Sequence, residues 1–168
     1  DTMKVLDAAK KKYNFQIHYP GAGVGGPCLP INSYQLLNSA KRAGVKLSMI
    51  ESGRKINEKM PDHVVKLTSD AFKESNKSLQ NSDILILGVS YKPNVKDIQL
   101  SPAEKIIKKL QNLGTNVHVY DPYFSSDNVF GIKVEENLDD LLPKMDAAII
   151  VTAHDDFKKI KISSFAKM

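Results

Sequence analysis

The sequence of 168 residues has a single cysteine and no tryptophan. One cysteine excludes an internal disulfide bond and favours a reducing compartment. Long hydrophobic runs are also missing. The two longest, residues 84–89 and 147–151, are far shorter than the roughly 18 residues that a membrane-spanning helix needs, and no signal peptide is evident. We therefore expect a cytoplasmic protein that does not enter a membrane.

Basic residues outnumber acidic ones, 24 to 19, and give a formal net charge of +5. Such a charge could favour nucleic acid, a membrane surface or an anionic small molecule. The lysines, however, are scattered, as at residues 10–12, 108–109 and 158–161. No basic strip alternates with aromatic residues in the manner of single-strand binders. We expect no nucleic-acid partner.

Residues 1–75 predict helices interrupted by one loop rich in glycine and proline. Asn32 or Ser33 would cap the second helix, and Gly44 would end it. Pro61 suits the first turn of the last helix, because its φ is fixed and its missing N–H is not needed there. The polar run at residues 73–82 indicates a boundary. The predicted helices cover residues 1–13, 33–42, 46–58 and 61–72.

Residues 76–168 predict an α/β domain. Residues 84–89 form a continuous apolar strand, as expected in a sheet that is covered on both faces. Short connections between strands and helices indicate parallel strands with crossover helices. We expect a Rossmann-like, three-layer domain that is incomplete, because no fourth strand fits after Phe157. The other strands are expected at residues 116–120 and 147–152, and the helices at 102–113, after a capping box at Ser101, and 138–142.

Residues 19–30 (YPGAGVGGPCLP) surround Cys28 with four glycines and three prolines. Three of the glycines match G-x-G-x-x-G. No strand precedes them, prolines interrupt the residues after them, and no acidic residue lies about 20 positions on, so this is not the dinucleotide fingerprint. Glycine lets a ligand approach closely, and a helix start favours a thiolate. A lone cysteine is also often an inert apolar residue. The residues alone leave nucleophile and inert thiol both open.

Residues 88–97 (GVSYKPNVKD) come after the first predicted strand at its carboxyl end, where open α/β sheets bind their ligands. Lys92 could pair with a phosphate, and Tyr91 could pack against a sugar or a base. The alternative is a polar loop whose lysines face water. His154 precedes two aspartates and is interpreted as a helix cap. The four histidines lack the spacing of metal ligands, so we expect no metal site.

Several motifs are similar to those of the UDP-glucose/GDP-mannose dehydrogenase family, in the family's order and over essentially the whole chain. Within the family, the sequence most resembles the UDP-N-acetyl-D-mannosamine dehydrogenase branch. In that branch an aliphatic residue, here Ile31, follows Cys-x-Pro where UDP-glucose enzymes have lysine. The motifs are residues 20–30, resembling the catalytic-cysteine loop, 55–61 (KINEKMP), the central helix, 87–102 (LGVSYKPNVKDIQLSP), the nucleotide-sugar segment, 119–123 (VYDPY) and 152–154 (TAH).

The resemblance implies an NAD-dependent, homodimeric enzyme that oxidises the primary alcohol of a UDP-sugar to a carboxylate in two hydride transfers. Cys28 would attack the intermediate aldehyde. Gly25 and its loop would wrap the sugar, and Tyr91 and Lys92 would contact the UDP-sugar. Gln99 stands where the family has an arginine that reaches NAD. Two further departures are Asn32 in place of an aspartate and Ala22 in place of a proline.

The resemblance also implies that this sequence is the C-terminal portion of such an enzyme, with NAD bound mainly by a preceding domain. Residues 1–75 would form the catalytic-cysteine loop and the central, dimerising helical segment. Residues 76–168 would form the UDP-sugar-binding domain. We expect the chain alone not to oxidise a substrate. The alternative is a stand-alone UDP-sugar-binding or dimerisation module without catalysis.

Overall fold

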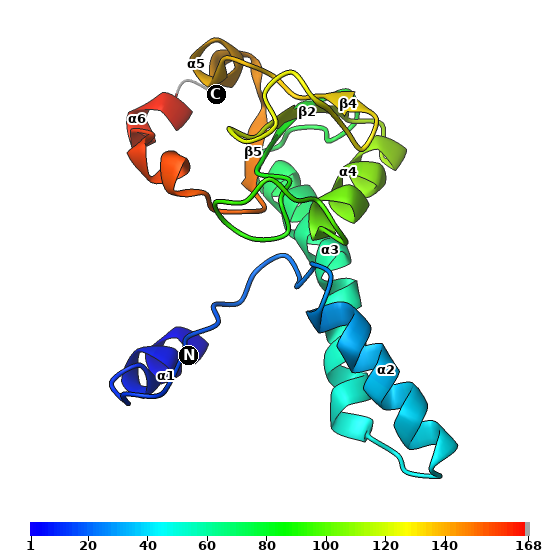
Figure 1. Ribbon diagram of the computed structural model, residues 1–168. Coiled ribbons are helices and arrows are strands. Elements are labelled where there is room, and N and C mark those ends of the chain that lie inside the picture. Colours follow the sequence, from blue (N-terminus) through cyan, green and yellow to red (C-terminus); the bar gives the residue numbers. More distant parts are fainter. Residues whose placement is uncertain (167–168) are drawn as a thin grey trace.

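The computed structural model describes residues 1–166, and it consists of a helical hairpin joined to a small α/β domain (Figure 1). Helix α1 (Thr2–Ala9) stands apart at the end of an extended segment, and α2 (Leu29–Arg42) and α3 (Ser48–Glu74) form the hairpin. The remaining elements are β1 (Asp83–Leu87), α4 (Pro102–Asn112), β2 (Asn116–Tyr120), β3 (Asn128–Val129), β4 (Ile132–Lys133), α5 (Leu138–Leu141), the 3-10 helix η1 (Leu142–Lys144), β5 (Ala147–Ile150), the 3-10 helix η2 (Asp155–Lys159) and α6 (Ile162–Phe165).

Helix α2 begins earlier than the sequence suggested. Its first residue is Leu29, so the prediction that Asn32 or Ser33 caps it is wrong. Pro30 fits the first turn, where its missing N–H costs no helical hydrogen bond. The Ser33 hydroxyl instead donates to the Leu29 carbonyl at 2.8 Å. Because α2 begins at Leu29, Cys28 occupies its N-cap position.

The two helices predicted on either side of Pro61 are one continuous helix of 27 residues, α3. A proline inside a helix removes one hydrogen bond and usually breaks or kinks the helix. Here Pro61, Val65 and Phe72 are buried on the face that packs against α4. We infer that this packing offsets the missing bond. Helix α2 ends at Arg42, as predicted, and Gly44 follows just beyond it with a φ of +70°.

The sheet has the order β2-β1-β5, with both pairs parallel, which confirms the Rossmann-like, three-layer α/β prediction. The central strand β1 alternates between two cores. Ile84 and Ile86 belong to the core under α3 and α4, whereas Leu85 and Leu87 belong to a second core with α5, η1 and η2. All four side chains are fully buried. The division at residue 75 stays a prediction, because α3 contributes to the first of these cores.

The sequence did not predict the antiparallel hairpin β3–β4. Its two-residue turn has positive φ at both Phe130 and Gly131, +53° and +83°. Asparagine or aspartate usually stands at the first of these turn positions, so the phenylalanine hid the hairpin. The Glu135 N–H, just beyond β4, donates to the Val119 carbonyl on the outer side of β2 at 2.8 Å. Over the described part of the chain, no helix is both long and apolar enough to cross a membrane.

Candidate functional site

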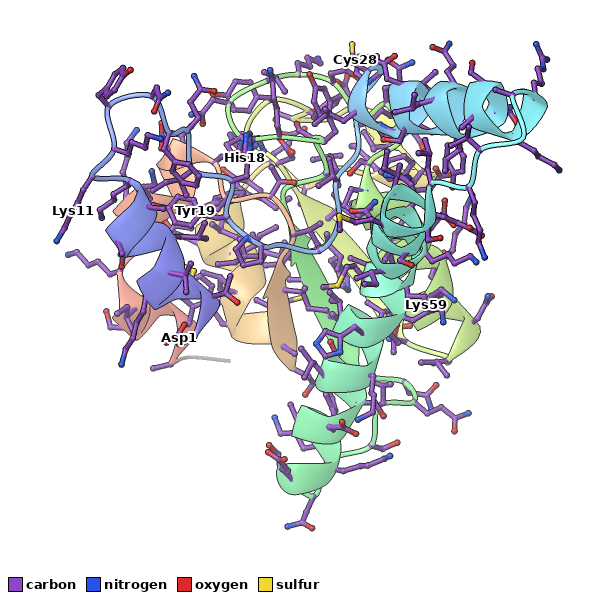
Figure 2. The ribbon with its side chains drawn as sticks, turned by 90° about the horizontal axis from the view of Figure 1, so that it is seen from below. Asp1, Lys11, His18, Tyr19, Cys28 and Lys59 are labelled. Atoms are coloured by element: carbon purple, nitrogen blue, oxygen red, sulfur yellow. The ribbon has the colours of Figure 1, made fainter. Side chains whose placement is uncertain are left out.

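Cys28 is a free, exposed thiol at the start of α2 (Figure 2). Its carbonyl accepts the Asn32 N–H at 2.8 Å and so closes the first helical turn. Within residues 1–166 its side chain makes no capping hydrogen bond. Cys28 is therefore not buried, contrary to one of the two alternatives, and its action as a nucleophile stays a prediction.

The glycines before Cys28 pack closely against the segment after β1. A Cβ atom at Gly25 would lie 2.3 Å from the Leu100 carbonyl oxygen, which no side chain tolerates without a backbone shift. A Cβ atom at Gly26 would lie 2.7 Å from the Tyr91 ring. The Gly26 N–H also donates to the Gln99 carbonyl at 2.8 Å. The structure thus brings Gly25, Tyr91 and Gln99 together beside the cysteine loop.

Lys92 belongs to the same cluster. Its ammonium nitrogen lies 5.5 Å from the centroid of the Tyr91 ring, within the range of a cation–π contact. Lys92 is exposed, and the Tyr91 ring is partly buried. A cation and an aromatic face therefore lie next to the loop that carries Cys28. This pair is chemically suited to a phosphate and to a base or sugar.

The loop after β1 is held by a buried histidine. His154 is fully buried, and its Nδ1 accepts the Asn94 N–H at 2.9 Å. Its Nε2 lies 3.1 Å from the buried Asp121 carboxylate, so the neutral Nε2–H tautomer fits both contacts. Asp121 also accepts the Val89 N–H at 2.8 Å. His154 precedes η2, as predicted for a cap, but within the described residues its side chain caps nothing and joins three loops instead.

Further hydrogen bonds fix the same loop. The Thr152 hydroxyl donates to the Ser90 carbonyl at 2.5 Å, and the Ser90 hydroxyl donates to the Val95 carbonyl at 2.6 Å. The Asn94 amide donates to the Asp155 carboxylate at 2.7 Å. The hydrogen bonds from Lys158 and Asn94 lower the pKa of Asp155 from its ordinary value of 3.8. Hydrogen bonds therefore fix the backbone around Tyr91 and Lys92, which we call the platform. Lys92 itself is exposed, and its contact with a ligand stays a prediction.

Helix α3 supplies a contact that sequence reasoning missed. The Asn57 side chain bonds the backbone of Val24, four residues before Cys28. Residues 55–61 carry one of the family-like motifs, yet nothing in the sequence connects Asn57 with a residue 33 positions away. The contact between His154 and Asp121 was missed for the same reason, because these residues also lie 33 positions apart.

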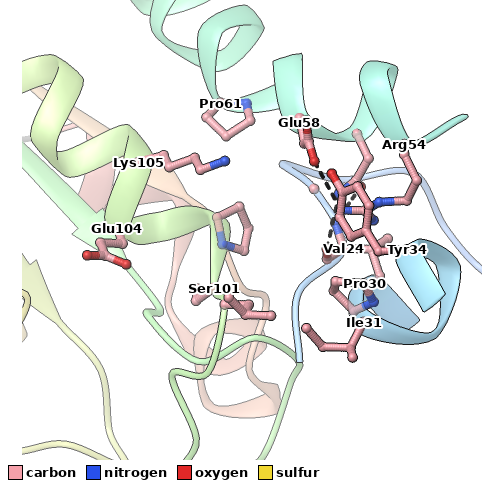
Figure 3. A pocket seen from close by; sticks show the side chains of 14 residues that line it. Val24, Pro30, Ile31, Tyr34, Arg54, Glu58, Pro61, Ser101, Glu104 and Lys105 are labelled. Atoms are coloured by element: carbon pink, nitrogen blue, oxygen red, sulfur yellow. Dashed lines mark hydrogen bonds and ion pairs between the residues drawn. The ribbon is translucent and has the colours of Figure 1, made fainter. Parts of the chain in front are cut away.

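A cavity of about 240 Å³ lies behind the cysteine loop, between α2, α3 and the start of α4 (Figure 3). Arg54 and Lys105 reach it from opposite helices, and Glu58 and Glu104 also line it. Neither Cys28 nor Tyr91 lines this cavity, which borders the cysteine loop at Val24 and the segment after β1 at Leu100.

The sequence also predicted that Gln99 stands where the family has an NAD-contacting arginine, and that the protein has no metal site. The Gln99 side chain is exposed and uncharged, and its backbone N–H donates to the Asp97 carboxylate at 2.8 Å. Its contact with a cofactor stays a prediction. In the part of the chain that the structure describes, no group of three or more His, Cys, Asp or Glu residues could hold a metal ion.

Comparison with known proteins assigns the class of this fold and site. Residues 85–168 match the UDP-binding domain of the UDP-glucose/GDP-mannose dehydrogenase family, and residues 1–59 match its central domain. These are domains of oxidoreductases. The chain belongs to the UDP-glucose/GDP-mannose dehydrogenase family.

Individual relatives support the same family assignment. The chain is 32% identical to the UDP-N-acetyl-D-mannosamine dehydrogenase of Pyrococcus horikoshii, over 98% of this chain and 37% of the relative. The solved structure of that enzyme superposes with a TM-score of 0.83. Identity to the UDP-N-acetyl-D-glucosamine 6-dehydrogenase of Salmonella typhi is 29%, over 95% of this chain and 38% of that relative. The chain therefore spans little more than a third of the length of these relatives.

Proposed function

We propose that this chain is the catalytic-cysteine and UDP-sugar-binding portion of an NAD-dependent nucleotide-sugar 6-dehydrogenase. The observation that carries the proposal is the contact between two motifs far apart in the sequence. Gly26, two residues before Cys28, touches the Tyr91 ring, and Lys92 lies over the same ring. A thiol, an aromatic face and a cation are the groups that a reactive sugar attached to a diphosphate and a base would require.

Cys28 would act in the second half of the oxidation. Its thiolate adds to the aldehyde carbon of the half-oxidised sugar, and the new carbon–sulfur bond gives a thiohemiacetal. Loss of a hydride from the carbon and of a proton from its hydroxyl converts this to a thioester, and water then cleaves the carbon–sulfur bond to release the carboxylate and the free thiol. NAD supplies the hydride acceptor for each of the two oxidation steps. Asn32 is neutral at the position where the family has an aspartate, so it cannot serve as a carboxylate base for that water.

Tyr91, Lys92 and Gly25 would bind the substrate. Lys92 would pair with the diphosphate, and Tyr91 would pack against the base or the sugar. Gly25 is held against Leu100, so it would contact the sugar through its backbone. Gln99 would offer NAD a neutral side chain, and its carbonyl is already used by Gly26. NAD would be bound mainly by residues outside the matched segments.

The proposed sugar is UDP-N-acetylmannosamine, which would be oxidised to UDP-N-acetylmannosaminuronate. The names of the Pyrococcus and Methanocaldococcus relatives, each 32% identical, support this choice. UDP-N-acetylglucosamine is the second candidate, since relatives named for that sugar are 28–29% identical. We further propose that the enzyme is a homodimer in the cytoplasm, where Cys28 would stay a reduced thiol.

Isothermal calorimetry with UDP and with both UDP-sugars tests the substrate proposal. We expect binding of both sugars, with UDP-N-acetylmannosamine the tighter ligand, and no reduction of NAD by residues 1–168 alone. The described chain has no strand that leads into a glycine-rich turn and helix for a dinucleotide. NAD reduction by the chain alone would contradict the expected inactivity, and absence of any heat would contradict the UDP-sugar site.

The rival function is a UDP-sugar-binding or dimerisation module that never catalyses. This function also predicts binding of the UDP-sugar, but it gives the Cys28 thiol no chemical role. Slower alkylation of Cys28 in the presence of UDP-sugar would favour the dehydrogenase portion, because only that function brings the sugar to the sulfur.

A further inference from the structure

The Asn57 side chain holds both backbone polar groups of Val24. Its Oδ1 accepts the Val24 N–H at 2.7 Å, and its Nδ2 donates to the Val24 carbonyl at 3.1 Å. Val24 lies in a loop without regular secondary structure, where backbone groups need partners from elsewhere. The Asn57 side-chain amide therefore provides hydrogen-bond partners for both the N–H and the carbonyl of one residue in the cysteine loop.

Pro61 leaves one backbone carbonyl of α3 free beside the loop. Because Pro61 has no N–H, the Asn57 carbonyl receives no helical hydrogen bond from four residues ahead. The loop passes the Asn57 carbonyl at Gly23, whose φ of +137° suits glycine. A Cβ atom at Gly23 would lie 3.5 Å from the Asn57 carbonyl oxygen and 3.3 Å from the Pro102 Cβ. The loop thus runs through a narrow gap between α3 and the start of α4.

The same loop is held from its other side by the segment after β1. The Gly26 N–H donates to the Gln99 carbonyl, and Gly25 abuts the Leu100 backbone. Val24 and Gly26 are therefore fixed to two different elements, only a few residues before Cys28. Loss of either hold would let the loop move away from the Tyr91 ring.

We propose that Asn57 is a positioning residue that fixes the Cys28 loop against the Tyr91–Lys92 platform. The inference rests on the proposed function, in which Cys28 reacts with a sugar bound on that platform. Among the described residues, the Asn57 side chain hydrogen-bonds to Val24 and to no part of the platform, so it acts through Val24. Its effect should therefore appear in the behaviour of the loop more than in ligand affinity.

Amide hydrogen exchange followed by NMR tests the hold without any ligand. We expect Asn57→Ala to speed exchange at Gly26 about tenfold, because two hydrogen bonds that order the loop are lost. Gly26 is the informative amide, since its own acceptor is Gln99. Exchange in β1 serves as the internal reference for global destabilisation. Lys59→Ala, an exposed change on the same helix (Figure 2), should leave Gly26 unchanged.

Unchanged exchange at Gly26 in Asn57→Ala, relative to β1, would overturn the proposal. If that variant does not fold, Asn57→Asp is the substitute, because it keeps the acceptor for the Val24 N–H and loses only the donor to the Val24 carbonyl. We then expect exchange at Gly26 to speed up about threefold relative to β1. Wild-type exchange at Gly26 in this variant would again overturn the proposal.

The second arm measures how well UDP-N-acetylmannosamine slows the alkylation of Cys28 by iodoacetamide. In Asn57→Ala we expect a dissociation constant within about threefold of wild type and loss of most of the protection, because the platform stays intact while the loop moves. Equal protection in the variant and wild type would contradict a positioning role. Absence of binding to the wild-type chain would instead remove the proposed function, and the exchange experiment would still decide whether Asn57 holds the loop.

Discussion

Glycines in the cysteine loop differ in what surrounds them. Gly25 is buried against the Leu100 carbonyl, whereas Gly21 has no atom within 4 Å of a would-be Cβ. Neither glycine has a positive φ, so alanine at either site meets no special backbone strain. The difference between them is therefore steric.

We expect Gly25→Ala to destabilise the protein by about 1–3 kcal/mol, because the loop must move off Leu100. The matched change Gly21→Ala should stay within about 0.5 kcal/mol of wild type. Urea denaturation measures both. Equal midpoints for the two variants would show that the close approach at Gly25 does not contribute to stability.

The buried pair of His154 and Asp121 predicts a large effect from one substitution. His154→Ala leaves the Asn94 N–H without its acceptor and the buried carboxylate with one donor fewer, and it opens a cavity. We expect a loss of about 3–4 kcal/mol, as for other broken buried polar networks. His63 is exposed, so His63→Ala should change the free energy of unfolding by less than about 0.5 kcal/mol. Comparable losses from both variants would contradict the network.

Asp155 predicts a pH effect at the same loop. Its pKa is lowered, first by the hydrogen bond from Lys158 and then by that from Asn94. A lowered folded-state pKa means that the stabilising contribution is present above the unfolded value and is lost as pH falls through the folded one. NMR titration of the carboxyl carbon should give a pKa below 3.8, and Lys158→Ala should raise it. A wild-type pKa at or above 3.8 would argue against the hydrogen bonds.

At the scale of elements, the carboxyl ends of β1 and β5 approach closely at Gly88. Its φ is +82°, and a Cβ atom there would lie 2.3 Å from the Thr152 carbonyl oxygen. Gly131 in the β3–β4 turn has nearly the same φ, +83°, with nothing within 4 Å. Alanine at either position would have to adopt the same unfavourable positive φ, but only at Gly88 would its Cβ also clash with a neighbour.

Gly131→Ala should cost about 1 kcal/mol, from the left-handed conformation alone. Gly88→Ala should cost at least about 2 kcal/mol more, because the loops that carry Tyr91 and His154 must separate. Thermal unfolding of both variants checks this. If Gly88→Ala were no worse than Gly131→Ala, the close contact between the two loops would not matter for stability.

Elements with a strong local pattern could be predicted from the sequence, and those decided by distant contacts could not. The apolar run of β1 and the Ser101-Pro102 start of α4 were recognised because their signals are local. The continuity of α3 was missed, because a proline usually breaks a helix and the packing of α3 on α4 cannot be read from the sequence. Asn57 and His154 act across 33 and 60 positions, which no periodicity reveals. Of the residues that resemblance predicted, the structure brings Gly25, Tyr91 and Gln99 to one place, with Lys92 on the Tyr91 ring. Cys28 follows two residues after Gly26 in the same loop, and its role stays a prediction.

At the scale of the whole molecule, residues 1–19 contribute little to the folded core. None of their side chains is buried, and α1 stands apart from the rest (Figure 1). Deletion of residues 1–19 should therefore change the free energy of unfolding of the remaining chain by less than about 1 kcal/mol. Chemical denaturation of residues 20–168 tests this, and a much larger loss would mean that the segment packs against the core in solution.

The central claim is that Cys28 belongs to a UDP-sugar site built with Tyr91 and Lys92. The most direct test is the rate at which iodoacetamide alkylates Cys28, measured by mass spectrometry with and without saturating UDP-N-acetylmannosamine. We predict at least about a tenfold slower reaction with the ligand, and loss of this protection in the double variant Tyr91→Ala, Lys92→Ala. An alkylation rate that the ligand leaves unchanged, under conditions where calorimetry shows it bound, would contradict the claim.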